Sequence, residues 1–204
     1  MKLNIGSSSC HLDGWINLEY DVQYWRKNTF SGERISPKAT RDMPDVFGDA
    51  KNLSNLYKDN TFDEVRASHV LEHLPIGVAI ATLKEWNRIL KVGGLLRVIV
   101  PDIEFIINKW VRRESEEKWW NVQKNDLGLY LDSELKSPFN NEDEALVHLI
   151  FLNGHHKNAF TNKTLSRYMS ISGFDDIRRC DNEEENIPDC TVCDYSLRLI
   201  GRKI

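Results

Sequence analysis

The sequence lacks the features that mark membrane-spanning, secreted or nucleic-acid-binding proteins. No apolar run approaches the roughly 18 residues that cross a bilayer, so we expect no membrane insertion. An apolar segment begins at the first residue and leaves no room for a signal peptide, so we expect a cytoplasmic protein. The net charge of −4 argues against general nucleic-acid binding, which needs a basic surface to meet phosphates.

Cysteine is also scarce. Four cysteines in 204 residues do not make a disulfide scaffold, so we expect reduced thiols. Cys190 and Cys193 are spaced like half of a zinc site, but no second pair of Cys or His with ligand spacing lies near them in the sequence. We therefore expect no metal site.

The length and the pattern of the chain indicate a single domain over 1–204. A chain of this size can bury a substantial core, and it shows no internal repeat, linker or low-complexity tract. The periodic patterns loosen at about 112–158, which we interpret as an insertion covering the binding edge of a sheet. The oligomeric state has no signature in the sequence.

Predicted strands and helices alternate along the chain. Apolar or alternating segments predict strands at 1–5, 15–19, 45–50, 61–69, 95–100, 174–180 and 195–199. Helical spacing predicts helices from 76 to a stop at Gly93 and Gly94, after Asp102 as N-cap, at 142–152, and after Thr161 as N-cap. A further short helix is expected within 20–44. The alternation predicts a mainly parallel sheet closed by an antiparallel pair.

The first strand runs into a small polar turn, Gly6-Ser7-Ser8-Ser9. Gly6 gives the backbone freedom, and small side chains let a ligand approach the main-chain N–H groups. The turn lacks the second and third glycines of a dinucleotide fingerprint, so an ordinary exit from a strand explains it equally well. The next strand follows closely, whereas a full helical crossover needs about a dozen residues or more, so the first helix should be shortened.

Two predicted strands end in acidic residues. Glu19 ends the second strand, and a carboxylate there can accept hydrogen bonds from two vicinal ribose hydroxyls. Asp49 ends the third strand, where it can accept from an exocyclic amine such as that of adenine. The structural alternatives are a surface acid at Glu19 and a turn cap at Asp49.

Taken in order, these segments resemble a class I S-adenosylmethionine-dependent methyltransferase of the compact group of predicted methyltransferases. The resemblance covers about half of the chain, and its segments are 3–7, 14–19, 48–50, 62–73 and 90–102, with Ser172-Gly173-Phe174 before the closing strands. It implies an α/β fold with a Rossmann-like, mainly parallel seven-stranded sheet, helices on both faces, a shortened first helix and a C-terminal antiparallel hairpin.

The resemblance also implies a residue for each part of the cofactor, S-adenosylmethionine: Gly6 and Ser7 under the methionyl group, Glu19 at the ribose, Asp49 and Ala50 at the adenine, and the backbone of Ser68 and His69 near the sulfonium. The chain departs from the family pattern in two ways. The first turn lacks the usual later glycine, and the segment between the first two strands is short.

Methyl transfer asks little of the protein, because the sulfonium already activates the methyl group. The protein must position the acceptor and, for an alcohol or phenol, remove its proton. His69 at a strand end and the pair His155-His156 in a loop are the candidate bases, since histidine titrates near neutrality. For His73 we expect a structural role. We therefore expect methyl transfer to a small-molecule or sugar-like acceptor, most simply at oxygen.

Two other functions are consistent with parts of the sequence. A non-catalytic binding module could use Trp119 and Trp120 of the insertion as interface anchors, although the same residues could form the insertion's own core. A nicotinamide-dependent oxidoreductase is disfavoured by the shortened first helix, because a pyrophosphate needs a helix N-terminus at that place.

Overall fold

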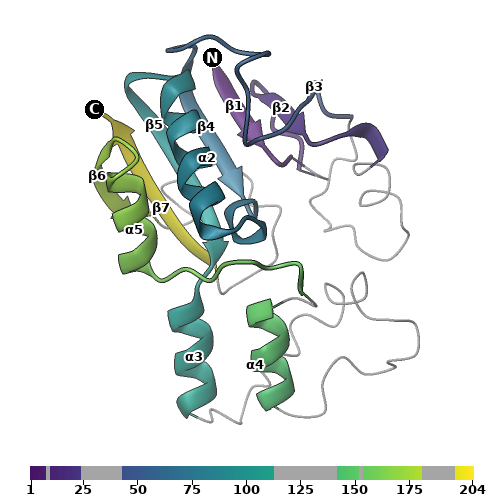
Figure 1. Ribbon diagram of the computed structural model, residues 1–204, viewed down its shortest axis with the longest axis vertical. Coiled ribbons are helices and arrows are strands. Elements are labelled where there is room, and N and C mark those ends of the chain that lie inside the picture. The colour runs from purple at the N-terminus through teal and green to yellow at the C-terminus, as the bar shows by residue number, and fades with distance from the viewer. Residues whose placement is uncertain (8–9, 24–42, 113–141, 152–153, 181–195) are drawn as a thin grey trace.

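The computed structural model describes residues 1–7, 10–23, 43–112, 142–151, 154–180 and 196–204. These residues form one seven-stranded sheet with the order β3-β2-β1-β4-β5-β7-β6 (Figure 1). The strands are β1 Lys2–Ile5, β2 Ile16–Glu19, β3 Val46–Phe47, β4 Phe62–Ser68, β5 Leu90–Pro101, β6 Phe174–Arg179 and β7 Ser196–Lys203. The helical elements are the 3₁₀ turn η1 Leu71–His73 and the α-helices α2 Ile76–Ile89, α3 Ile103–Arg112, α4 Glu142–Phe151 and α5 Asn162–Ser170.

Five strands of the sheet are parallel. β1 pairs with β2 on one side and β4 on the other, β3 extends the sheet beyond β2, and β5 follows β4. β7 runs antiparallel to both β5 and β6. The carboxyl ends of β1 to β5 therefore share one edge of the sheet, and β7 begins there, since Ser196 pairs with Pro101. This topology confirms the predicted Rossmann-like, mainly parallel seven-stranded sheet with an antiparallel pair at the C-terminus.

Helices α2 and α5 lie side by side on one face of the sheet, whereas α3 and α4 pack against each other beyond the carboxyl end of β5 (Figure 1). The apolar stripe of α2 explains its position, because Ala79, Leu83 and Trp86 are buried. They join a core that the strands supply from residues such as Leu3 and Val65. Burying each large apolar side chain stabilises this packing by about 1.5–3 kcal/mol.

The predicted helix starts are confirmed. The carboxylate of Asp102 accepts hydrogen bonds from the backbone N–H groups of Glu104 and Phe105, at 3.1 and 3.2 Å, at the start of α3. Thr161 and Thr164 form a reciprocal capping box at the start of α5. Both caps satisfy N–H groups that the first turn of a helix leaves without intrahelical partners.

The end of α2 and the start of β5 differ from the prediction. Helix α2 ends at Ile89 rather than at the glycines, and β5 begins at Leu90 and passes through Gly93 and Gly94. Leu90 is completely buried and pairs with Phe62 at the start of β4. The burial of this leucine in the sheet outweighs its capacity to continue the helix.

The expectation of reduced cysteines is wrong for Cys10, which forms a disulfide bond. Its partner lies outside the described residues, and spacing along the chain does not show which cysteines meet in space. Within the described ranges, no helix is long and apolar enough to cross a membrane. The cytoplasmic location stays a prediction.

Several predictions concern residues that the structure does not describe. These are Ser8 and Ser9, most of the short helix expected within 20–44, Trp119 and Trp120, and the pair Cys190 and Cys193. Most of the insertion expected at 112–158 also lies outside the described residues. Its final part includes α4, where Asp143 accepts a 2.6 Å hydrogen bond from the indole N–H of Trp110 on α3.

Candidate functional site

The turn after β1 is fixed against β2. The backbone N–H groups of Gly6 and Ser7 both donate to the carbonyl of Leu18, at 2.9 and 3.1 Å. Gly6 has φ +67°, and a Cβ added there would lie 2.6 Å from Cγ2 of Val70. Both the backbone conformation and the lack of space therefore require glycine at the position predicted to lie under the cofactor.

Two buried hydroxyl groups lie at the ends of adjacent strands. Oγ of Ser7, after β1, and Oγ of Ser68, at the end of β4, have no hydrogen-bond partner among the described residues. A buried polar group without a partner costs about 1–3 kcal/mol, so a polar ligand at this edge would relieve that cost. The role of Ser7 at the methionyl group stays a prediction.

The two predicted acids lie on adjacent segments, because Glu19 ends β2 and Asp49 follows the neighbouring strand β3. Glu19 is buried, accepts a hydrogen bond from the N–H of Tyr20 at 2.7 Å, and its carbonyl accepts from Gly48 at 2.8 Å. Asp49 lies two residues beyond the short β3 rather than at its end. Its carboxylate accepts from the N–H of Lys51 at 3.0 Å and pairs with that residue's Nζ at 3.2 Å. Asp49 thus caps its turn, as in the structural alternative, and its role at adenine stays a prediction.

His69 occupies an uncommon backbone position at the end of β4. It has φ +54°, a value that few residues other than glycine adopt and that often occurs at functional sites. Its Nδ1 lies 2.9 Å from Oε1 of Glu72, and its Nε2 lies 3.2 Å from Oγ of Ser196. The imidazole is thus held between a carboxylate and a hydroxyl group.

Glu72 is a carboxylate buried at the centre of the site, with an exposed fraction of 1%. Burial alone would raise the pKa of Glu72, but the contact with His69 and the nearby imidazoles of His73 and His156 together outweigh it, so the pKa lies below its ordinary value. Oε1 of Glu72 is paired with His69, and Oε2 has no hydrogen-bond partner within the described part of the chain.

The segment after α4 packs on Glu72 through its backbone. The N–H groups of Lys157 and Asn158 donate to the carbonyl of Glu72, at 2.7 and 3.1 Å. This contact brings His156 to the site, where its ring lies 5.1 Å from that of His73. Burial lowers the pKa of His156 to about 4, against the opposing charge of Glu72, so its imidazole is neutral near pH 7.

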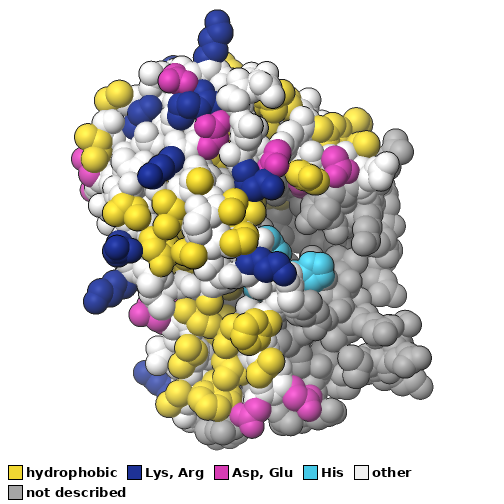
Figure 2. Space-filling view, viewed as in Figure 1, with side chains coloured by type: hydrophobic (Ala, Val, Ile, Leu, Met, Phe, Trp, Pro, Cys, Tyr) yellow, Lys and Arg dark blue, Asp and Glu magenta, His cyan; other side chains and the backbone are white. Residues whose placement is uncertain are grey.

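His155 differs from its neighbour. Its side chain is exposed, and its carbonyl lies 3.2 Å from Nδ1 of His73. The structure therefore brings His69 and His156 together around Glu72, while His155 contributes its backbone. Figure 2 shows histidine side chains at the surface between the part of the molecule with α2 and α5 and the part with α3 and α4.

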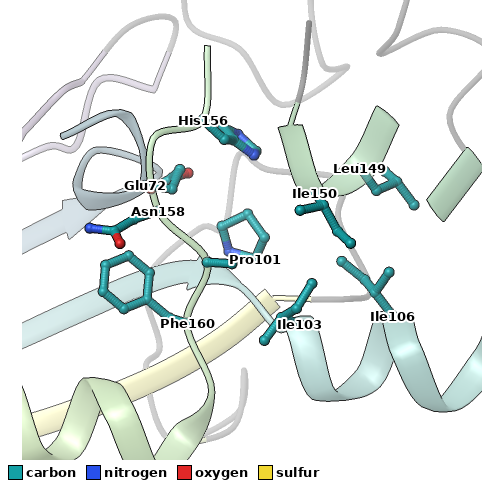
Figure 3. Close-up of a pocket in the computed structure, with 10 residues that line it drawn as sticks. Glu72, Pro101, Ile103, Ile106, Leu149, Ile150, His156, Asn158 and Phe160 are labelled. Atoms are coloured by element: carbon teal, nitrogen blue, oxygen red, sulfur yellow. The ribbon is translucent and has the colours of Figure 1, made fainter. Parts of the chain in front are cut away.

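A small pocket opens beside this cluster (Figure 3). Most of its lining is apolar, and one end is polar. The apolar residues are Pro101, Ile103, Ile106, Leu149, Ile150, Ala159 and Phe160, and the polar residues are Glu72, His156 and Asn158. The pocket therefore lies between the carboxyl end of β5, helices α3 and α4, and the segment that follows α4.

The chain is similar to known methyltransferases in sequence and in fold. Residues 24–98 match a family described as "Methyltransferase domain". A segment of 65 residues is 42% identical to the demethylmenaquinone methyltransferase of Staphylococcus saprophyticus, covering 30% of this chain and 26% of that protein. A solved S-adenosylmethionine-dependent methyltransferase from Archaeoglobus fulgidus has a TM-score of 0.55 at 14% identity, over 99% of this chain and 85% of that one.

A second solved structure, a possible histamine N-methyltransferase from Thermotoga maritima, gives a TM-score of 0.54 at 17% identity, over 100% of this chain and 82% of that one. The chain has the class I methyltransferase fold. The matched segment and the shared fold support the family resemblance predicted from the sequence, and S-adenosylmethionine is the cofactor that this resemblance implies. The family match begins after Glu19, so it does not include the first turn.

Two residues of this candidate site were not predicted from the sequence. Glu72 is the single acid in the otherwise apolar or histidine-containing run 70–74, and that isolation was an available signal. Ser196 reaches His69 from 127 positions away, and no local pattern marks it. The apolar pocket was missed for the same reason, because its walls come from segments far apart in the chain.

Proposed function

We propose that this protein transfers a methyl group from S-adenosylmethionine to an oxygen atom of a small, partly apolar acceptor. One observation carries the proposal: His69, at the carboxyl end of β4, contacts Glu72, and Glu72 lines a pocket with apolar walls and one polar end. The matched methyltransferase segment supports the reaction class.

The residues around the first turn are proposed to hold the cofactor. The buried hydroxyls of Ser7 and Ser68 would bind the polar methionyl end, and the buried carboxylate of Glu19 would accept from the ribose hydroxyls. Asp49 and Ala50 follow next to Glu19, near the proposed position of adenine. When bound, the cofactor supplies an activated methyl group on its sulfonium.

The pocket beside Glu72 is proposed to receive one end of the acceptor, because its volume of about 10 Å³ admits a group of about the size of one water molecule. Its isoleucine and leucine walls favour an apolar contact, and Asn158 and His156 at the polar end favour a hydrogen-bonding group there. Because α4 supplies Leu149 and Ile150, the end of the proposed insertion contributes to acceptor selection. A sugar-like acceptor would need an apolar face or substituent to fill these walls.

His69 is proposed to remove the proton of the acceptor hydroxyl. With its Nδ1–H directed toward Glu72, a neutral imidazole keeps its lone pair on Nε2, the atom that now faces Ser196. An acceptor hydroxyl that replaces the serine contact would donate its proton to Nε2 as the methyl group transfers. His156 and His155 are proposed to act at the acceptor side, with the exposed His155 contributing less.

Calorimetric titration with S-adenosylmethionine and S-adenosylhomocysteine tests the cofactor, and release of S-adenosylhomocysteine with phenols, sugars and amines tests the acceptor. His69→Gln should keep cofactor affinity within about twofold, because the predicted contact is from the backbone, yet lower the transfer rate by about 10²–10⁴. His155→Ala should lower it far less. Absence of heat with both ligands refutes the proposal and favours the binding-module hypothesis, whose tryptophans lie outside the described residues.

A further inference from the structure

Three side chains at the polar end of the pocket have the composition of a metal site. Glu72, His73 and His156 each offer a ligand atom, and these atoms lie within 4.8 Å of one another. We propose that they bind one divalent transition-metal ion, with Zn²⁺ as the best fit. No local pattern in the sequence predicts this site, because the third ligand follows the first two only after α2, β5, α3 and α4.

The distances require a modest closure of the side chains. Nitrogen and oxygen ligands lie about 2.0–2.2 Å from Zn²⁺, so ligand atoms in a tetrahedral site are about 3.3–3.6 Å apart. The backbone that carries the ligands is already fixed, since Lys157 and Asn158 donate to the carbonyl of Glu72. Rotation of the imidazole rings can therefore supply most of the closure.

Both histidines are oriented by backbone carbonyls. A carbonyl oxygen only accepts, so the 3.2 Å contact of His73 Nδ1 with the carbonyl of His155 requires a proton on Nδ1 and leaves the lone pair on Nε2. One ring nitrogen of His156 donates to the backbone of Ile150, which leaves the other nitrogen as a ligand. A metal-binding histidine usually has such a carbonyl partner on its second nitrogen.

Glu72 gives an independent reason to expect a cation. It is 1% exposed, and its Oε1 is paired with Nδ1 of His69 at 2.9 Å. Its Oε2 has no hydrogen-bond partner among the residues that the structure describes. A buried carboxylate oxygen without a partner is costly, and a bound metal ion would supply that partner.

The ligand set selects the class of metal. Two imidazoles and one carboxylate suit zinc and other transition metals, whereas Mg²⁺ and Ca²⁺ prefer oxygen ligands throughout. Glu72 and His156 also line the pocket, so an open coordination position would face the acceptor. If the proposed function holds, an acceptor oxygen bound there would lose its proton more readily, because a metal lowers the pKa of a coordinated oxygen.

Metal binding is tested on the whole protein without cofactor or acceptor, so the result does not depend on methyl transfer. After treatment with a chelator, Zn²⁺ is titrated by calorimetry, and Co²⁺ by its visible absorption. We expect one ion per chain. Glu72→Gln, His73→Ala and His156→Gln should each weaken Zn²⁺ binding by at least about tenfold.

His155→Ala is the matched control, because it removes a neighbouring imidazole but keeps the carbonyl that orients His73. It should bind Zn²⁺ within about twofold of the unchanged protein. Circular dichroism of the metal-free variants checks that each one folds. His73→Ala changes a half-buried side chain and keeps the buried carboxylate, so it tests metal binding even if Glu72→Gln does not fold. Unchanged Zn²⁺ affinity in all three ligand variants, or a thiolate-to-cobalt absorption band, overturns the proposal.

Discussion

Replacing Gly6 by alanine tests whether the turn after β1 is built around a close contact. The substitution imposes two separate costs. The left-handed backbone at φ +67° disfavours any residue with a Cβ by about 1–2 kcal/mol. The new methyl would also lie 2.6 Å from Cγ2 of Val70, which is a stiff β-branched side chain packed against the core. We expect overpacking to add about 1–3 kcal/mol.

Gly14→Ala separates the two costs. Gly14 has φ +78°, and a Cβ there meets nothing within 4 Å, so it carries the backbone cost alone. In a protein of this size about 1 kcal/mol lowers the melting temperature by about 2–4 °C. Gly14→Ala should therefore lower it by about 2–8 °C, and Gly6→Ala by about 4–20 °C.

Thermal unfolding of the two variants measures the difference, and a double-mutant cycle identifies its source. In a Val70→Ala background the clash is absent, so Gly6→Ala should cost no more than Gly14→Ala. Equal losses for Gly6→Ala and Gly14→Ala in the unchanged background would refute the reasoning. Because Gly6 is predicted to lie under the methionyl group, its variant alone should also bind S-adenosylmethionine at least about tenfold more weakly.

Three other substitutions have defined outcomes. Glu19→Gln keeps an oxygen for the N–H of Tyr20 but loses the charge, so calorimetry should show S-adenosylmethionine affinity reduced about tenfold or more with little change in melting temperature. Asp63 has a pKa lowered to about 2, mainly by a hydrogen bond from Lys91. The ionised carboxylate therefore stabilises the fold above about pH 4, and this stabilisation is lost as the pH falls towards 2. Asp63→Asn should make the acid unfolding curve less steep between these two pH values. Thr161→Ala removes the cap of α5 and should cost about 1 kcal/mol in denaturant unfolding.

The fold was predictable because its signals are local. The stripe of α2 and the apolar run of β5 give the order of elements, and Asp102 and Thr161 mark two helix starts that the structure confirms. The boundary between α2 and β5 was not predictable from the glycines. It depends on Leu90 being buried against the start of β4, which is a contact between segments that only the folded sheet brings together.

The proposed cofactor side of the site was more predictable than the proposed acceptor side. Each parallel strand places its last residues at one edge, so a strand prediction also predicts that Ser7, Glu19 and Ser68 will lie near one another. The acceptor side has no such rule. Ser196 meets His69 through an antiparallel strand, and the pocket depends on two helices beyond β5.

His155 and His156 show why the proposed acceptor side could not be predicted from the sequence. They are identical neighbours in a segment with neither helical nor strand period, so the sequence predicts the same role for both. The backbone hydrogen bonds from Lys157 and Asn158 to Glu72 fix how the segment lies. That contact leaves His156 half-buried beside the carboxylate and the side chain of His155 exposed. A main-chain contact with Glu72 therefore sets the difference between the two histidines. Glu72 lies before α2, far from this segment in the chain, so no local sequence pattern predicts the contact.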